Sequence, residues 1–211
     1  MVRETTIAKL ISVFMPELAG EFSIRELAKR AGISYDAAYR HTGFLTEKGV
    51  LKEKTIGKAT ACSLNLNSII TRKYLENISV SKTQEFLEKD AVFGKMLGEL
   101  VENLRKSASD ELLCTVLFGS YARGEQKESS DIDILIIAST FEVRERLERE
   151  CGGIEYRHGV DIAPLITTAS EFKKMLKSKQ RMVAHEVQLD GMVLYGFEKY
   201  YQLLSEGIGN D

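Results

Sequence analysis

Two short stretches decide the fold of this chain: residues 117–124, which read LFGSYARG, and residues 130–135, which read SDIDIL. Residues two apart in a β-strand lie on the same face, so Asp131 and Asp133 project together. Two carboxylates this close repel each other unless a cation lies between them. Because neither stretch contains His or Cys, the all-oxygen donor set favours Mg²⁺ or Mn²⁺ over zinc.

The residues between the two strands predict a site for a nucleoside triphosphate. Apolar runs at 112–118 and 132–138 are typical of buried strands. Gly119 lets the backbone approach a ligand closely, and Ser120 can begin a helix whose free N–H groups attract phosphate. Arg123, one helical turn later, can add a guanidinium to the same phosphates. The alternative is a polar turn beside a solvated strand edge, but the combination of all these features in one string favours the phosphate site.

Length and composition indicate an ordered protein with one large or two small domains. The chain has 211 residues, 44% of them hydrophobic, and only two prolines. No apolar run approaches the roughly 20 residues that span a bilayer, and no signal-peptide pattern begins the chain, so we expect no membrane segment. The three cysteines are odd in number and widely spaced, which indicates free thiols in a reducing cytoplasm.

Charge is distributed unevenly along the chain. Residues 1–68 carry a formal net charge of +3 and the remainder carries −5. This asymmetry indicates two functions and favours a nucleic acid as the partner of the N-terminal part.

The N-terminal part has the pattern of a helix-turn-helix. Apolar residues at helical spacing predict a first helix over 5–15. Ser23 and Glu26 form a capping-box signature at the start of a second helix. Gly32 marks a turn, and a third helix is predicted over 35–48, with its inward face formed by Ala38, Phe44 and Leu45.

A predicted hairpin follows, with strands at 50–54 and 60–64 and a basic tip. Residues 24–51, IRELAKRAGISYDAAYRHTGFLTEKGVL, together with this hairpin resemble the winged-helix family of DNA-binding domains. The resemblance implies that the helix at 35–48 enters the major groove and that the hairpin touches the DNA backbone. A protein-binding or dimerisation module is the alternative, and we keep a homodimer as an expectation. The residues expected to contact DNA are Tyr35, Tyr39, Arg40, Thr42, Lys54 and Lys58.

The central region is predicted to be helical over 67–109, in two pieces broken near 77–82. A charged helix is expected at 142–151, followed by a turn at Gly152 and Gly153. The next strand, 160–166, contains one acidic residue, Asp161. Phosphoryl transfer with two metal ions requires a third carboxylate beside a shared pair, so Asp161 is assigned this role.

The strings FGSYARG, SSDIDILI and VDIAPL resemble the DNA polymerase beta-type nucleotidyltransferase superfamily, and most of all its minimal nucleotidyltransferase branch. The resemblance implies an α/β fold with a short mixed sheet flanked by helices. It also implies that Gly119 and Ser120 hold the triphosphate and that Asp131 and Asp133 bind two Mg²⁺ or Mn²⁺ ions. Asp161 would bind the catalytic ion and help to activate the acceptor hydroxyl.

The sequence therefore predicts three segments: a winged helix-turn-helix at 1–66, a helical connector at 67–110 and a nucleotidyltransferase domain at 111–211. The expected activity is transfer of a nucleoside monophosphate from a triphosphate, with ATP as the expected donor, to a hydroxyl acceptor. The resemblance suggests a partner protein as that acceptor, in an antitoxin-like role. The alternative is a DNA-binding transcriptional regulator whose nucleotidyltransferase-like domain only senses nucleotide.

Overall fold

The computed structural model describes residues 5–56, 59–178, 180 and 182–208. The chain forms two compact units, Met1–Ile78 with Ile208–Asp211 and Ser79–Gly207. None of the helices in the described ranges is both long and apolar enough to cross a membrane.

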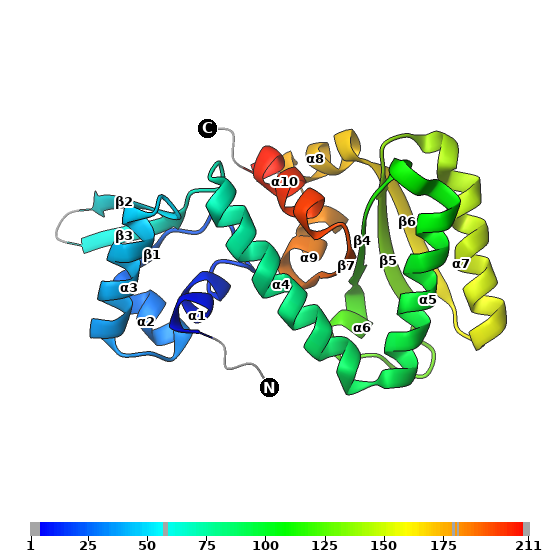
Figure 1. Cartoon of the computed structure of the whole chain (residues 1–211), viewed down its shortest axis with the longest axis horizontal. Helices are drawn as coiled ribbons and strands as arrows, with labels where there is room; N and C mark the ends of the chain where they lie inside the picture. Colours follow the sequence, from blue (N-terminus) through cyan, green and yellow to red (C-terminus); the bar gives the residue numbers. More distant parts are fainter. Residues whose placement is uncertain (1–4, 57–58, 179, 181, 209–211) are drawn as a thin grey trace. The chain divides into compact units, whose positions relative to one another are not determined.

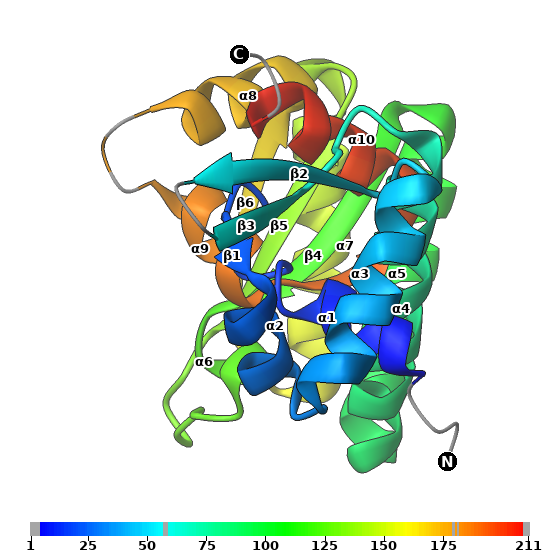
Figure 2. The same cartoon turned by 90° about the vertical axis from the view of Figure 1, so that its left-hand side faces the viewer.

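The first unit combines short helices with a small antiparallel sheet of strand order β1-β3-β2. Strands β2 and β3 are adjacent and form a hairpin (Figure 2). The elements are α1 (Thr6–Ser12), β1 (Phe22–Ser23), α2 (Ile24–Ala31), α3 (Tyr35–Glu47), β2 (Leu51–Ile56) and β3 (Ala59–Leu64).

The predicted capping box fixes the start of α2. The Ser23 hydroxyl accepts a hydrogen bond from the Glu26 backbone N–H at 3.2 Å, and the Glu26 carboxylate accepts one from the Ser23 backbone N–H at 2.8 Å. Gly32 ends the helix with φ of +64°, a left-handed conformation that favours glycine. The predictions of two helices joined by a glycine turn, and of the hairpin after them, are confirmed.

The phase of α3 differs from the prediction at two positions. Thr42 is fully buried, and its hydroxyl donates to the Tyr39 carbonyl oxygen. Phe44, expected to point inward, is 41% exposed. The buried face of α3 is formed by residues spaced four and three apart, which is the spacing of one side of a helix: Ala38, Thr42 and Leu45. The prediction that Thr42 contacts DNA is therefore wrong.

Two long helices follow, α4 (Ile69–Lys89) and α5 (Ala91–Ala108). They are separated at Asp90, whose carboxylate caps α5 by accepting hydrogen bonds from the Val92 and Phe93 backbone N–H groups. The break predicted near residues 77–82 is wrong, because α4 continues through that stretch.

The second unit is built on a four-stranded mixed sheet of order β6-β5-β4-β7. Strands β5 and β6 are parallel, and β4 is antiparallel to both β5 and β7. Helices α5 and α7 cover one face, and α8, α9 and α10 lie on the other (Figure 1). The strands are β4 (Leu112–Phe118), β5 (Ile132–Ala138), β6 (Ile162–Thr168) and β7 (Met192–Tyr195). The helices are α6 (Gly119–Arg123), α7 (Arg144–His158), α8 (Ala169–Lys177), α9 (Val183–Asp190) and α10 (Phe197–Ile208), and 3₁₀ turns lie at Ser109–Glu111 and Phe141–Val143.

Helix α7 runs through the position where a turn was predicted. Gly152 and Gly153 lie inside it, because Leu147, Cys151 and Ile154 are buried against the sheet and require helical spacing throughout. Two interior glycines cost about 1 kcal/mol each relative to alanine, which the burial of this apolar stripe outweighs.

Successive side chains of strand β5 point to opposite faces of the sheet. Ile132, Ile134 and Ile136 belong to the core formed with α5 and α7. Asp133 alternates with them and therefore projects toward the opposite face. Strand β5 thus presents the Asp133 carboxylate on one side of the sheet and isoleucine side chains on the other.

Candidate active site

The sharp turn from β4 into α6 creates the centre of the site. Gly119 has φ of +72° at this turn. A Cβ placed on Gly119 would lie 2.9 Å from Asp133 Cγ and overlap its Oδ2 atom. Only glycine leaves room for the Asp133 carboxylate here, so the Gly-Ser motif and the paired carboxylates form one structural unit.

The third predicted carboxylate lies beside the first. Ile132 pairs with Ile162 in the parallel ladder, and the Ile132 backbone N–H donates to the Asp161 carbonyl oxygen at 2.8 Å. Asp131 and Asp161 therefore occupy neighbouring positions at the starts of β5 and β6. By strand alternation both lie on the same face as Asp133. Asp131 and Asp161 are exposed, whereas Asp133 is half-buried.

The surroundings of Asp133 disfavour its negative charge. Burial raises the pKa of Asp133, and the charges of Asp131 and Glu186 raise it further. The guanidinium of Arg123 acts in the opposite direction. The local field around Asp133 is therefore one in which an added cation would stabilise the ionised carboxylate.

These residues fit a divalent cation in their chemistry. The donors are carboxylate oxygens, which suit Mg²⁺ or Mn²⁺, and the missing Cβ of Gly119 lets the Asp133 carboxylate lie directly beside the turn. In the described part of the chain, however, no three His, Cys, Asp or Glu side chains are gathered closely enough to hold a metal ion. The site made by Asp131, Asp133 and Asp161 remains a prediction.

Arg123 lies at the end of α6, where it was expected to meet phosphate. Its Nε donates to Glu125 Oε2 at 2.8 Å, and its Nη1 lies 3.6 Å from Asp190 Oδ2. The pKa of Arg123 is raised, mainly by the hydrogen bond to Glu125 and also by Asp190. The guanidinium is therefore charged and is held between two carboxylates.

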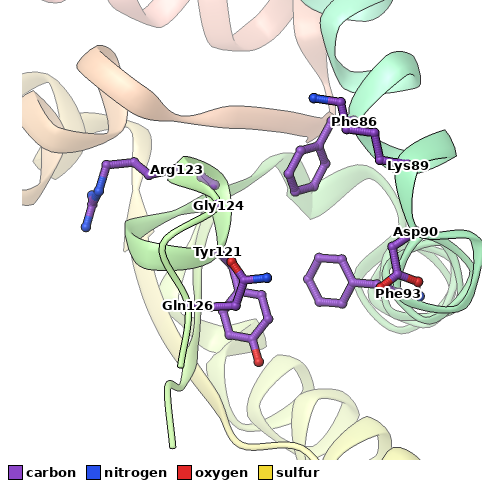
Figure 3. Close-up of a pocket in the computed structure, with 9 residues that line it drawn as sticks. Phe86, Lys89, Asp90, Phe93, Tyr121, Arg123, Gly124 and Gln126 are labelled. Atoms are coloured by element: carbon purple, nitrogen blue, oxygen red, sulfur yellow. Dashed lines mark hydrogen bonds between the residues drawn. The ribbon is translucent and has the colours of Figure 1, made fainter. Parts of the chain in front are cut away.

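The other side of α6 forms an aromatic cavity of about 290 Å³ (Figure 3). The Tyr121 ring stacks on Phe93 with centroids 5.2 Å apart, and Phe86 meets Phe93 edge-on at 6.3 Å. The Arg123 side chain extends away from this cavity (Figure 3). Tyr121 thus anchors α6 to α5, while Arg123 lines the cavity without taking part in the stacking of the rings.

Two functional candidates were missed by the sequence analysis: Glu186 and Asp190, both on α9. They lie four residues apart, so they share one helical face. Glu186 acts on Asp133 and Asp190 pairs with Arg123. The spacing was visible in the sequence, but only the packing of α9 against α6 shows what this face meets.

In the first unit, the predicted DNA contacts divide into three groups. Tyr35 and Tyr39 are 51% and 60% exposed, and their rings stack with centroids 6.3 Å apart. Arg40 and Lys54 are also exposed. Thr42 is buried, as described above, and Lys58 lies outside the described residues.

The mixed sheet, the Gly-Ser turn and the paired carboxylates define the class of nucleotidyltransferases. The sequence model of the nucleotidyltransferase domain family matches residues 99–189. Three proteins of Methanocaldococcus jannaschii, each named as a candidate protein adenylyltransferase, are similar in sequence. The first is 32% identical over 83 residues, which cover 36% of this chain and 56% of that protein, just over half its length. The second is 30% identical over 38% of this chain and 83% of its own length. The third is 35% identical over 48% of this chain and 96% of its own length.

Among solved structures, a toxin–antitoxin crystal structure with AMP-PNP is 22% identical and covers 52% of this chain and 82% of its own chain, with a TM-score of 0.38. The chain belongs to the minimal nucleotidyltransferase superfamily, a family of nucleotidyl-transferring enzymes.

Proposed function

We propose that the second unit transfers a nucleoside monophosphate, with ATP as donor, to a hydroxyl group of a protein. The acceptor oxygen attacks the α-phosphorus in line and pyrophosphate leaves. The names of the similar proteins, which describe protein adenylyltransferases, support both ATP and a protein acceptor.

Each residue has a role in this proposal. Gly119 and Ser120 hold the triphosphate, and Arg123 adds positive charge to it. Asp131 and Asp133 hold divalent cations, and Asp161 completes the site and orients the acceptor hydroxyl. Bound Mg²⁺ or Mn²⁺ would neutralise the triphosphate and lower the pKa of the acceptor hydroxyl.

The proposal depends most on one observation. The Asp133 carboxylate occupies the space beside Gly119 that the side chain of any other residue would fill. This contact brings a carboxylate and a phosphate-binding turn to the same point. A nucleotide sensor would require the turn but not the carboxylate beside it, because binding alone does not need both.

The test is an incubation of the full chain with MgCl₂, a cell extract and ATP labelled at the α-phosphate. We expect label to appear on protein, and to disappear in the Asp131→Asn/Asp133→Asn variant. ATP labelled at the γ-phosphate should give no label, which distinguishes nucleotidyl transfer from phosphoryl transfer. Glu128→Gln, an exposed carboxylate in the neighbouring loop, is the matched control and should retain transfer.

The second candidate function is nucleotide sensing without chemistry. The measurement that separates the two is ATP binding by calorimetry alongside the label transfer. Binding without any transfer, in every extract tested, would favour the sensor and end the transferase proposal.

We further propose that the first unit binds DNA. The exposed tyrosines and Arg40 on α3, together with Lys54 on β2, support this assignment. Arg40→Ala should weaken retention of the chain's own promoter fragment and reduce the salt dependence of log K by about one. Arg149→Ala on α7 is an exposed matched control in the other unit. If the two variants bind equally, Arg40 is not a DNA contact.

A further inference from the structure

Arg123 has two acidic partners that differ in how firmly they are held. Glu125 follows α6 in the chain and its side chain is 65% exposed. Asp190 is the last residue of α9, and its side chain is 31% exposed. An exposed loop carboxylate changes partners at little cost, because surface ion pairs contribute about 1 kcal/mol or less.

The end of α9 is fixed by the packing around it. The Val187 carbonyl oxygen accepts hydrogen bonds from the Gly191 backbone N–H at 2.8 Å and from the Tyr200 hydroxyl at 3.2 Å. A Cβ on Gly191 would overlap that carbonyl oxygen and lie 3.0 Å from Val116 Cγ1. Asp190 therefore has a backbone position that it cannot change independently of the sheet.

Arg123 lies one helical turn after Gly119 on α6, on the side of the helix where Gly119 meets the Asp133 carboxylate. In keeping with this placement, its charge lowers the pKa of that carboxyl group. Its ion pairs, however, are with Glu125 and Asp190. A guanidinium released from Asp190 would be attracted to Asp133, whose charge is otherwise opposed by burial and by Asp131. Pairing between Arg123 and Asp133 would neutralise the carboxylate that the proposed function needs.

We propose that Asp190 is a positioning residue that holds the Arg123 guanidinium at the edge of the site and keeps it from pairing with Asp133. Arg123 is thereby available to a polyphosphate, and Asp133 is available to a cation. This inference rests on the proposed function, because it assigns a role to Asp190 within the same site.

The first experiment measures Mn²⁺ binding to the full chain, without nucleotide, by electron paramagnetic resonance of free Mn²⁺. We expect Asp190→Asn to weaken Mn²⁺ binding about tenfold, the size of one charge-assisted contact. In an Arg123→Gln background, the same substitution should have no further effect, because no guanidinium remains to pair with Asp133. A general electrostatic effect of removing one negative charge would weaken binding equally in both backgrounds, and that result would overturn the inference.

Two further variants separate positioning from structural damage. Asp190→Glu keeps the charge on the fixed end of α9 and should restore most of the Mn²⁺ affinity. Glu125→Gln removes the more exposed partner and should change the affinity less than about threefold. Thermal unfolding of each variant is measured in parallel to detect structural damage. The inference would also be refuted if the double variant Arg123→Gln/Asp190→Asn lost as much Mn²⁺ affinity as Asp190→Asn alone.

ATP binding by calorimetry distinguishes failure of the inference from failure of the proposed function. Wild-type protein that binds neither Mn²⁺ nor ATP would refute both. Wild-type binding with unchanged affinities in Asp190→Asn would refute only the positioning role. Wild-type binding and a weakened Asp190→Asn variant, without any label transfer, would retain the positioning role and end the transferase proposal.

Discussion

Replacing Gly119 by alanine tests whether the turn after β4 and the Asp133 carboxylate act as one unit. The added Cβ has two effects. It places an L-residue at φ of +72°, which costs about 1–2 kcal/mol. It also overlaps Asp133 Oδ2, so the carboxylate must move.

The two effects can be separated with a matched control. Gly159, which ends α7, has φ of +66°, and among the residues that the structure describes no neighbouring atom lies within 4 Å of a Cβ built on it. Gly159→Ala should therefore lose about 1–2 kcal/mol of stability without affecting the site. Gly119→Ala should lose at least as much stability, and label transfer should also fall about a hundredfold, the effect of a displacement near 1 Å at a reacting centre.

Stability is measured by urea unfolding followed by circular dichroism, and activity by transfer of α-phosphate label. A double-mutant cycle measures the coupling between the two positions. In an Asp133→Ala background the overlap with Oδ2 and Cγ is removed and the 3.2 Å contact with Cβ remains, so Gly119→Ala should cost little more than its backbone strain. Equal transfer by Gly119→Ala and Gly159→Ala, or no coupling between Gly119 and Asp133 in the cycle, would show that the contact between them has no function.

Three further predictions concern the core. In the described part of the chain the Thr115 hydroxyl is buried without a hydrogen-bond partner, so Thr115→Val should raise the free energy of unfolding by about 1 kcal/mol. The control is Thr83→Val, which removes a buried hydroxyl that donates to the Val193 carbonyl oxygen and should lower the free energy of unfolding by a similar amount. Gly152→Ala should stabilise α7 by about 0.5–1 kcal/mol, because within the described ranges a Cβ there meets one atom, at ordinary contact distance. Unchanged urea unfolding would show that the glycine does not destabilise the helix. Burial raises the pKa of Cys62 to about 11 and that of Cys151 to about 12. At pH 8 both thiols should therefore stay protonated and react with a thiol reagent only after unfolding. Rapid reaction in the folded protein would contradict their burial.

The parts of the fold that the sequence predicted well are those decided by neighbouring residues. The capping box at Ser23, the left-handed turn at Gly32 and the apolar runs of β4 and β5 are each specified within a few positions. Such signals act before any tertiary contact forms, so they are readable from one sequence.

The parts that the sequence missed depend on distant contacts. The two adjacent glycines in α7 disfavour a helix by their local propensity. The helix continues through them because its apolar residues are buried against the sheet. Thr42 is polar and was expected outside, but the helical phase set by Ala38 and Leu45 places it inside. Asp190 meets Arg123 only because α9 packs against α6, which lies far away in sequence.

Strand β5 combines a buried apolar run with a carboxylate whose negative charge its surroundings disfavour. Ile132 and Ile134 are almost fully buried on one side, while burial and the charge of Asp131 raise the pKa of Asp133 between them. Replacing the carboxylate by a neutral side chain should make this strand more stable, but it would remove the group to which we assign cation binding. Asp133→Asn should accordingly unfold at a higher temperature than the wild type while it transfers no label. A relative of this chain that lacks this carboxylate would then be inactive but more stable against heat.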